Sequence, residues 1–165
     1  MRGRILILVL TPLLGMFALF DAAGLRINTS ASLPMGLYIV NPNGGFVEFC
    51  PDDRGLSAQR HYRAWGVCSD GAAPLLKPVI GSPGDEIVLS HAGIAVNGKL
   101  LPHSAPMDRD SDGRPLAHWP AGRYTAAPRT LWVASSYNAR SYDSRYFGPI
   151  RESSVRARLR PLIAW

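Results

Sequence analysis

Hydrophobic and polar residues alternate in short runs along most of the chain. Apolar or alternating stretches of strand length are separated by clusters of glycine, proline, asparagine and aspartate. They are GLYIV (36–40), FVEFC (46–50), LKPVI (76–80), EIVLS (86–90), GIAVNGKLL (93–101), TLWVAS (130–135) and LRPLIAW (159–165). The pattern predicts a mainly β domain of mostly antiparallel strands, either barrel-like or made of coiled sheets.

Two segments depart from this pattern. Residues 56–65 carry a weak apolar face of Leu56, Tyr62 and Trp65, which favours a short helix. Residues 103–122 (HSAPMDRDSDGRPLAHWPAG) show no periodicity and are expected to form a long surface excursion. Its DRDSDG run lacks the glutamate and spacing of a calcium loop. Cys-x₂-Cys and His-x₃-His spacings are also absent from the sequence, so neither a metal nor a cofactor is predicted.

An uncharged apolar run occupies residues 5–20 and follows Arg2 and Arg4. By the positive-inside rule these arginines keep the N-terminus in the cytoplasm. A cleaved secretory signal peptide is the alternative, since residues 22–24 (AAG) offer a small-residue cleavage site. We favour an uncleaved single-pass anchor. The expected division is therefore a cytoplasmic N-terminus and anchor (1–25) and a periplasmic domain (26–165) held at the inner membrane.

The two cysteines, Cys50 and Cys68, suit an exported domain, because an oxidising compartment favours disulfides. A disulfide that closes this loop would add about 3 kcal/mol to the free energy of unfolding in the chain-entropy model. Two free buried thiols are the alternative.

Composition and charge limit the kinds of partner that the chain is expected to bind. The chain has 165 residues, 47% hydrophobic and 18% charged, with a net charge of +6, which indicates a packed core rather than disorder. The densest basic segment, RESSVRARLR (151–160), alternates with apolar residues as a strand does, so we do not expect nucleic-acid binding.

Lysine usage points to one unusual position. Of 18 basic residues only Lys77 and Lys99 are lysines. Lys99 follows a strong Asn-Gly hairpin signal and is typical of a surface position. Lys77 lies in the apolar segment PLLKPVI (74–80), where a solvated charge is unexpected. A buried lysine can lose its proton near neutral pH, which arginine cannot.

Three polar stretches become informative when they are taken together: SASLPMG (30–36), KPVIGSPGD (77–85) and SYDSRYFGP (141–149). Their order and spacing resemble the boxes of the type I signal peptidase family (serine peptidase family S26). The second stretch is close to the family's Lys-Arg-Val-x-Gly-x-Pro-Gly-Asp box, and the third to its Ser-x-Asp-Ser-Arg-x-x-Gly-x box. The first is more like the TraF branch of conjugal-transfer proteases, in which the nucleophile precedes a hydrophobic-Pro-x-Gly-hydrophobic-Tyr segment.

The resemblance implies a membrane-tethered β fold with a catalytic serine–lysine pair. In this alignment Ser32 is the nucleophile, Lys77 the general base, Ser30 the hydroxyl that completes the oxyanion hole, Ser141 the serine that orients the lysine amine, and Asp143 with Arg145 a structural ion pair beneath the site. Asn28 and Thr29, which precede the first stretch, are expected to be spacer.

The chemistry is consistent from first principles. A serine hydroxyl is a weak nucleophile until a base removes its proton. A lysine is such a base at neutral pH when burial destabilises its ammonium form, and Leu75, Leu76, Val79 and Ile80 are suited to bury Lys77. The Ser32 backbone N–H and the Ser30 hydroxyl are then the expected donors to the oxyanion.

Two departures from the general signal peptidase pattern stand out. The step from Ser32 to Pro34 is one residue shorter. The third box opens with SSYN (135–138) instead of Gly-Asp-Asn-Arg, so that Ser135 narrows the space that a glycine leaves beside the lysine.

The expected function is an endopeptidase that cleaves exported precursors near the membrane surface, with the precursor bound as an added strand. The first box favours a pilin precursor of a conjugative or type IV secretion system. A general type I signal peptidase and a non-catalytic anchored subunit of a secretion channel are the alternatives. A LexA-like self-cleaving regulator does not fit the apolar N-terminus.

Overall fold

The computed structural model describes residues 19–20 and 22–165. Most of the predicted anchor lies outside the described residues. Within the described part, no helix is long and apolar enough to cross a membrane.

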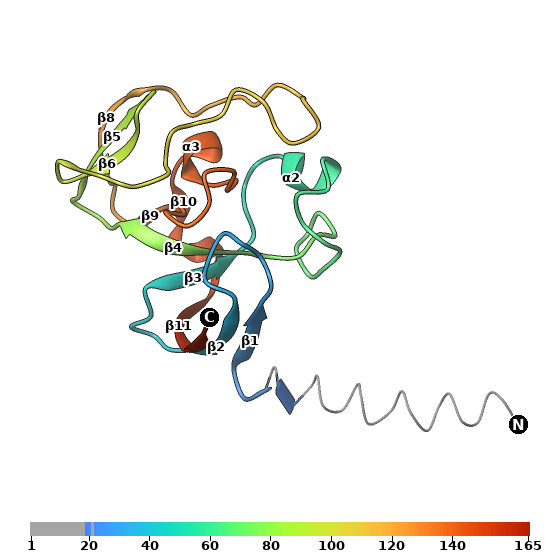
Figure 1. Cartoon of the computed structure of the whole chain (residues 1–165). Helices are drawn as coiled ribbons and strands as arrows, with labels where there is room; N and C mark the ends of the chain where they lie inside the picture. The colour runs from blue at the N-terminus through green and yellow to red at the C-terminus, as the bar shows by residue number, and fades with distance from the viewer. Residues whose placement is uncertain (1–18, 21) are drawn as a thin grey trace, which may run out of the picture.

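In this part of the chain the strands form two antiparallel sheets, one with seven strands in the order β1-β2-β11-β3-β4-β9-β10 and one with four in the order β7-β6-β5-β8. The predicted mainly β, antiparallel architecture is confirmed. The strands are β1 (Leu25–Asn28), β2 (Gly36–Val40), β3 (Phe46–Phe49), β4 (Leu75–Gly81), β5 (Glu86–Ser90), β6 (Gly93–Val96), β7 (Lys99–Leu100), β8 (Gly122–Thr125), β9 (Thr130–Val133), β10 (Ile150–Arg151) and β11 (Val155–Ala164). Figure 1 shows the smaller sheet at one side of the domain and the connection after β3 on the other side. Strands β1, β2 and β11 of the larger sheet lie at the lower end of the domain in this view.

The helical elements are short: α2 (Leu56–Gln59), α3 (Ser144–Phe147) and the 3₁₀ turn η1 (Glu152–Ser154). The helix expected over residues 56–65 is thus limited to its first turn. Its proposed apolar face is wrong, because Trp65 is 92% exposed. The left-handed backbone of Gly55 and His61 on either side of α2 explains why the helix does not extend.

Strand β9 joins the two sheets because both of its faces are buried. Leu131 and Val133 pack with Val47 and Phe49 of β3 in one apolar cluster. Trp132, on the opposite face, packs in a second cluster on residues of β5 and β6. This alternation follows from the two-residue period of a strand, and it fixes the smaller sheet to the larger one.

Strand β11 organises the other end of the larger sheet, where it pairs with both β2 and β3. Leu159 of β11 packs with Leu33 and Tyr38 in a third apolar cluster. The arginine-rich ending of the chain therefore forms a strand, as its alternation predicts.

Three strands were missed by the sequence pattern: β1, β8 and the two-residue β10, which pairs with β9. β1 begins at the last residue of the expected anchor, and it pairs with β2 in full register from Leu25 to Asn28. β8 takes the final residue of the expected excursion and pairs with β5. The rest of residues 103–122 contains only turns and one isolated bridge.

Candidate active site

A cavity of about 490 Å³ lies between the β1–β2 connection, the start of β4, the segment after α2 and the excursion. Ser30, Ser32 and Lys77, which the sequence places in one catalytic group, all line it. The remaining lining residues come from five segments: Ile27, Asn28 and Thr29; Tyr62, Arg63 and Ala64; Ala73, Pro74, Leu75 and Leu76; Met107, Arg109, Asp110, Ser111 and Leu116; Arg140, Tyr142 and Tyr146.

Asn28 holds the loop that carries Ser32. Its side-chain amide donates to the backbone oxygens of Ser30 (3.0 Å), Leu33 (3.3 Å) and Pro34 (3.1 Å). Its Oδ1 accepts from the backbone N–H of Ser30 at 3.2 Å. Only 6% of Asn28 is exposed. The prediction that Asn28 is spacer is therefore wrong: its position before a turn is an Asx-turn signal that the sequence reading did not use.

The residues after Ser32 explain the Leu-Pro-x-Gly pattern. Leu33 is buried in the third apolar cluster, and the carbonyl of Pro34 also accepts the Tyr38 hydroxyl at 2.8 Å. Gly36 has φ +151°, and an added Cβ would collide with the backbone oxygen of Ile163 on β11. A glycine is thus required for β11 to close against β2.

Lys77 is 3% exposed and pairs with Val47 of β3. Leu75 and Val79, two positions to either side and so on the same face of β4, pack in the apolar cluster of β3 and β9. Burial lowers the pKa of the Lys77 amine from its usual 10.5 to about 8; the Asp143 carboxylate opposes this shift and the Arg145 guanidinium adds to it. A substantial fraction of Lys77 is consequently neutral at slightly alkaline pH.

The amine of Lys77 donates to Ser141 Oγ at 2.9 Å. The backbone oxygen of Ser141 accepts from Arg145 Nη2 at 2.7 Å. Arg145 in turn donates two hydrogen bonds to the Asp143 carboxylate, Nε to Oδ1 at 2.8 Å and Nη2 to Oδ2 at 2.9 Å. Asp143 and Arg145 are 0% and 1% exposed. This buried pair holds the loop that presents Ser141 to the lysine.

Arg145 also ties the excursion to the site. Its Nη1 donates to the backbone oxygens of Ala105 and Ala139, each at 3.0 Å. The predicted support pair thus joins the segment before α3 to the start of the excursion.

Ser30 and Ser32 differ in how their polar groups are engaged. The Ser30 hydroxyl donates to Asn28 Oδ1 at 2.9 Å, so an oxyanion role requires that it rotate toward the cavity. Among the described residues, the Ser32 backbone N–H has no acceptor and its hydroxyl makes no hydrogen bond to Lys77. The N–H remains available for a ligand, and catalytic hydrogen bonds often shorten only when substrate is bound.

Ser135, which departs from the general signal peptidase pattern, is fully buried next to the loop that carries Ser32. Its hydroxyl donates to the backbone oxygen of Ser32 at 2.6 Å. This contact links residues 103 positions apart, so no local pattern in the sequence could have predicted it.

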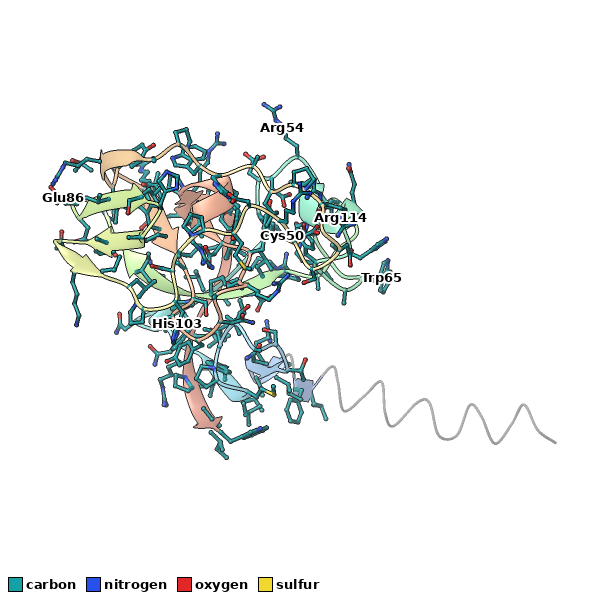
Figure 2. All side chains as sticks on the ribbon, turned by 45° about the horizontal axis from the view of Figure 1, so that its top comes forward. Cys50, Arg54, Trp65, Glu86, His103 and Arg114 are labelled. Carbon is teal, nitrogen blue, oxygen red and sulfur yellow. A yellow bond between two sulfur atoms is a disulfide. The ribbon has the colours of Figure 1, made fainter. Side chains whose placement is uncertain are left out.

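Cys50 and Cys68 form a disulfide. The loop that it closes carries Tyr62, whose hydroxyl donates to Asp110 Oδ2 of the excursion at 2.6 Å. Arg114 Nε donates to the same carboxylate oxygen at 2.7 Å. Figure 2 shows Arg114 and Trp65 on one side of the domain and Glu86 of β5 on the opposite side. The disulfide loop, the excursion and the loop that carries Ser32 all contribute residues to the lining of the cavity.

Fold and site together describe a β protein with a candidate serine–lysine centre in an open cavity. The family model of the signal peptidases (peptidase S26) matches residues 3–165. This chain belongs to that family, as the three boxes indicated.

Its relatives lie in the conjugal-transfer branch. The chain is 38% identical over 151 residues to the plasmid transfer protein TraF of Escherichia coli, with 87% of this chain and 85% of that protein covered. It is 32% identical over 178 residues to the conjugal transfer protein TraF of Agrobacterium tumefaciens (strain 15955), with 100% and 99% covered. A crystal structure of a signal peptidase I from Enterococcus faecalis V583 matches with a TM-score of 0.38 and 19% identity over 71% of this chain and 95% of that one.

Proposed function

We propose that this protein is a membrane-anchored serine endopeptidase that uses Ser32 as nucleophile and Lys77 as general base. The observation that carries the proposal is the buried Lys77 amine, with its pKa lowered to about 8, in the same cavity as Ser32. A lysine that only served packing or solubility would not need such an environment.

In the proposed reaction, the neutral Lys77 amine takes the proton of Ser32 Oγ as that oxygen attacks the scissile carbonyl carbon. The oxyanion accepts from the Ser32 backbone N–H and, after rotation, from the Ser30 hydroxyl. The Lys77 ammonium then protonates the leaving amine as the C–N bond breaks, which leaves an acyl-enzyme on Ser32. Lys77, again neutral, activates the water that hydrolyses this ester.

Surface chemistry supports a position at the membrane. Exposed apolar side chains lie at the end of the larger sheet formed by β1, β2 and β11, near the β1–β2 connection: Ile27 (63%), Met35 (42%), Leu162 (46%), Ile163 (60%) and Trp165 (76%). Figure 1 shows the C-terminus beside β2 at this end. Such a patch, with a terminal tryptophan, is typical of a bilayer interface. The nucleophile loop begins directly after β1, so cleavage would occur close to the membrane in the periplasm.

The substrate that we propose is the pilin precursor of a conjugative or type IV secretion system. The support is the Leu-Pro-Met-Gly box of the TraF branch, together with relatives that are named plasmid or conjugal transfer proteins. A general type I signal peptidase is the second candidate. The match to the signal peptidase family supports the same chemistry for both candidates.

Co-expression with a candidate pilin precursor tests the proposal. Mass spectrometry of the precursor should show a shorter product with the wild-type protein and none with Ser32→Ala or Lys77→Arg. Lys99→Arg is the matched control, because Lys99 is an exposed hairpin residue and should retain full processing. Normal processing by Lys77→Arg would contradict the neutral-amine mechanism, since an arginine stays charged.

Substrate range separates the two candidates. The wild-type protein should process the pilin precursor and leave ordinary secretory precursors intact in the same cells. Processing of both classes would favour the general signal peptidase. A non-catalytic subunit would be favoured if neither the wild-type protein nor Ser32→Ala cleaved a precursor and Ser32→Ala still supported conjugative transfer.

A further inference from the structure

We propose that Ser135 is a positioning residue that sets Ser32 relative to Lys77. The inference rests on the proposed function, and it concerns a residue that does not touch the substrate or the reacting atoms.

The hydrogen-bond capacity of the Ser135 hydroxyl is fully used. A hydroxyl has one proton to donate and two lone pairs to accept with. Ser135 Oγ accepts from the backbone N–H groups of Tyr137 (3.0 Å) and Asn138 (3.2 Å). Its proton is therefore directed to the remaining partner, the backbone oxygen of Ser32, at 2.6 Å. Because Ser135 is 0% exposed, water does not compete for this bond.

The backbone of Ser135 belongs to the same frame that holds the lysine. Its N–H donates to Asp143 Oδ2 at 3.2 Å. Asp143 is fixed by Arg145, and Arg145 also holds the backbone oxygen of Ser141, whose hydroxyl accepts from Lys77. One buried set of hydrogen bonds thus fixes both the Ser32 peptide and the Lys77 amine.

The consequence is geometric. A bond to the carbonyl of Ser32 fixes the peptide plane between Ser32 and Leu33, and with it the direction of the Ser32 Cα–Cβ bond. Asn28 holds the same loop through Ser30, Leu33 and Pro34, but none of its hydrogen bonds reaches Ser32 itself. Small displacements of a nucleophile from its base have large effects on rate.

A glycine at position 135 would have no side chain to make this bond, so the serine hydroxyl supplies a tether to the loop that carries Ser32.

The chain offers a matched control in Ser104. Ser104 is 1% exposed, its hydroxyl donates to the backbone oxygen of Leu101 at 2.6 Å, and it accepts from the backbone N–H of Ile94 at 3.0 Å. These bonds lie beside the smaller sheet and involve no residue of the site. Ser104→Ala therefore removes the same kind of buried hydrogen bonds without touching the nucleophile loop.

The experiment compares the full-length wild-type protein with its Ser135→Ala, Ser135→Cys and Ser104→Ala variants in membranes. The substrate is a fluorescence-quenched peptide that spans the cleavage site mapped in the co-expression experiment. The readouts are Tm, kcat, KM and the pH dependence of kcat/KM. Ser135→Cys keeps the shape of the side chain with a weaker donor, and it provides a folded variant if alanine is not tolerated.

We expect Ser135→Ala to lower kcat at least about tenfold with KM unchanged, because only the alignment for attack is lost. Ser135→Cys should give an intermediate kcat. Both should keep the wild-type pH inflection, since Lys77 and Ser141 are untouched. Ser104→Ala should lower Tm comparably and leave kcat within twofold.

The inference is overturned if the Ser135 variants keep wild-type kcat, or if their kcat falls no more than that of Ser104→Ala at the same loss of Tm. These outcomes leave the proposed function intact, provided that Ser32→Ala is inactive. If the wild-type protein itself does not cleave, the proposed function fails and this inference fails with it.

Discussion

The Lys77 amine meets the Ser141 hydroxyl at 2.9 Å across 64 residues of sequence, in a contact from which solvent is excluded. Strand β4 supplies the lysine, and the loop before α3 supplies the serine. The serine hydroxyl accepts a hydrogen bond from the amine, so it restrains the Nζ without adding a charge that would raise the pKa of Lys77. The contact therefore fixes the direction of the Lys77 amine and leaves its lowered pKa in place.

Loss of this restraint should reduce the rate of cleavage. We expect Ser141→Ala to lower kcat at least about tenfold, as part of the roughly 10²–10⁴-fold that a positioned general base contributes. Ser144→Ala is the control, because the buried Ser144 hydroxyl accepts from the backbone N–H of Val133 and, within the described residues, makes no hydrogen bond to Lys77. Peptide cleavage and Tm, measured together, distinguish the two. Equal losses of kcat in both variants would contradict the role of Ser141.

Activity should rise with pH and level off above about 8, where Lys77 loses its proton. Below that value the neutral fraction of Lys77 falls about tenfold per pH unit, and kcat/KM should follow it. The check is a profile of kcat/KM from about pH 6 to about pH 9.5, a range that extends to both sides of the expected inflection. A flat profile would show that Lys77 is not the base that limits the reaction.

The lowered pKa of Lys77 also predicts how the free energy of unfolding depends on pH. A salt-bridged lysine, whose pKa is raised, would have the opposite effect. Because the pKa is lower in the folded state, the unfolded chain binds more protons between about pH 8 and 10.5. The free energy of unfolding should therefore rise with pH across this window. Denaturant titrations should therefore show that the difference in the free energy of unfolding between the wild-type protein and Lys77→Met shifts in favour of the wild type across this window.

Local pattern was sufficient to predict much of this molecule. Alternation located most strands, and the apolar neighbours of Lys77 predicted its burial. The contacts that set the geometry of the site were not predictable in the same way. The bond of Ser135 to Ser32 joins the β1–β2 connection to the loop after β9, and such pairings depend on the order of strands in the sheet. The excursion is held by polar contacts instead of a regular strand or helix: its Asp110 accepts from Tyr62 of the disulfide loop and from Arg114 within the excursion.

Asn28 provides a fourth prediction, since its amide donates to three backbone oxygens. Asn28→Asp keeps the shape of the side chain and removes these donors. We expect a loss of about 1–3 kcal/mol in the free energy of unfolding, because the backbone oxygens of Ser30 and Leu33 lose their donor, together with a lower kcat. The oxygen of Pro34 keeps the Tyr38 hydroxyl. Asn43→Asp, at an exposed turn, is the control and should be neutral. Urea titrations measure the first effect, and peptide cleavage measures the second. A neutral Asn28→Asp would mean that the loop keeps its shape without Asn28.

The disulfide should affect substrate binding more than the chemical step. It spans 18 residues between Cys50 and Cys68, and the loop that it closes contributes Tyr62, Arg63 and Ala64 to the cavity wall. Ser32 and Lys77 lie outside this loop. Replacement of both cysteines by serine should therefore lower the free energy of unfolding by about 3 kcal/mol in the chain-entropy model and raise KM, while kcat changes little.

Reduction of the wild-type protein offers the matched comparison. A thiol reductant should give the wild type the Tm and KM of the double serine variant and leave that variant unchanged. This separates loss of the cross-link from any effect of the serine side chains. A fall in kcat at constant KM would contradict the assignment of this loop to the substrate wall, because it would place the effect of the disulfide on the positions of Ser32 and Lys77 instead.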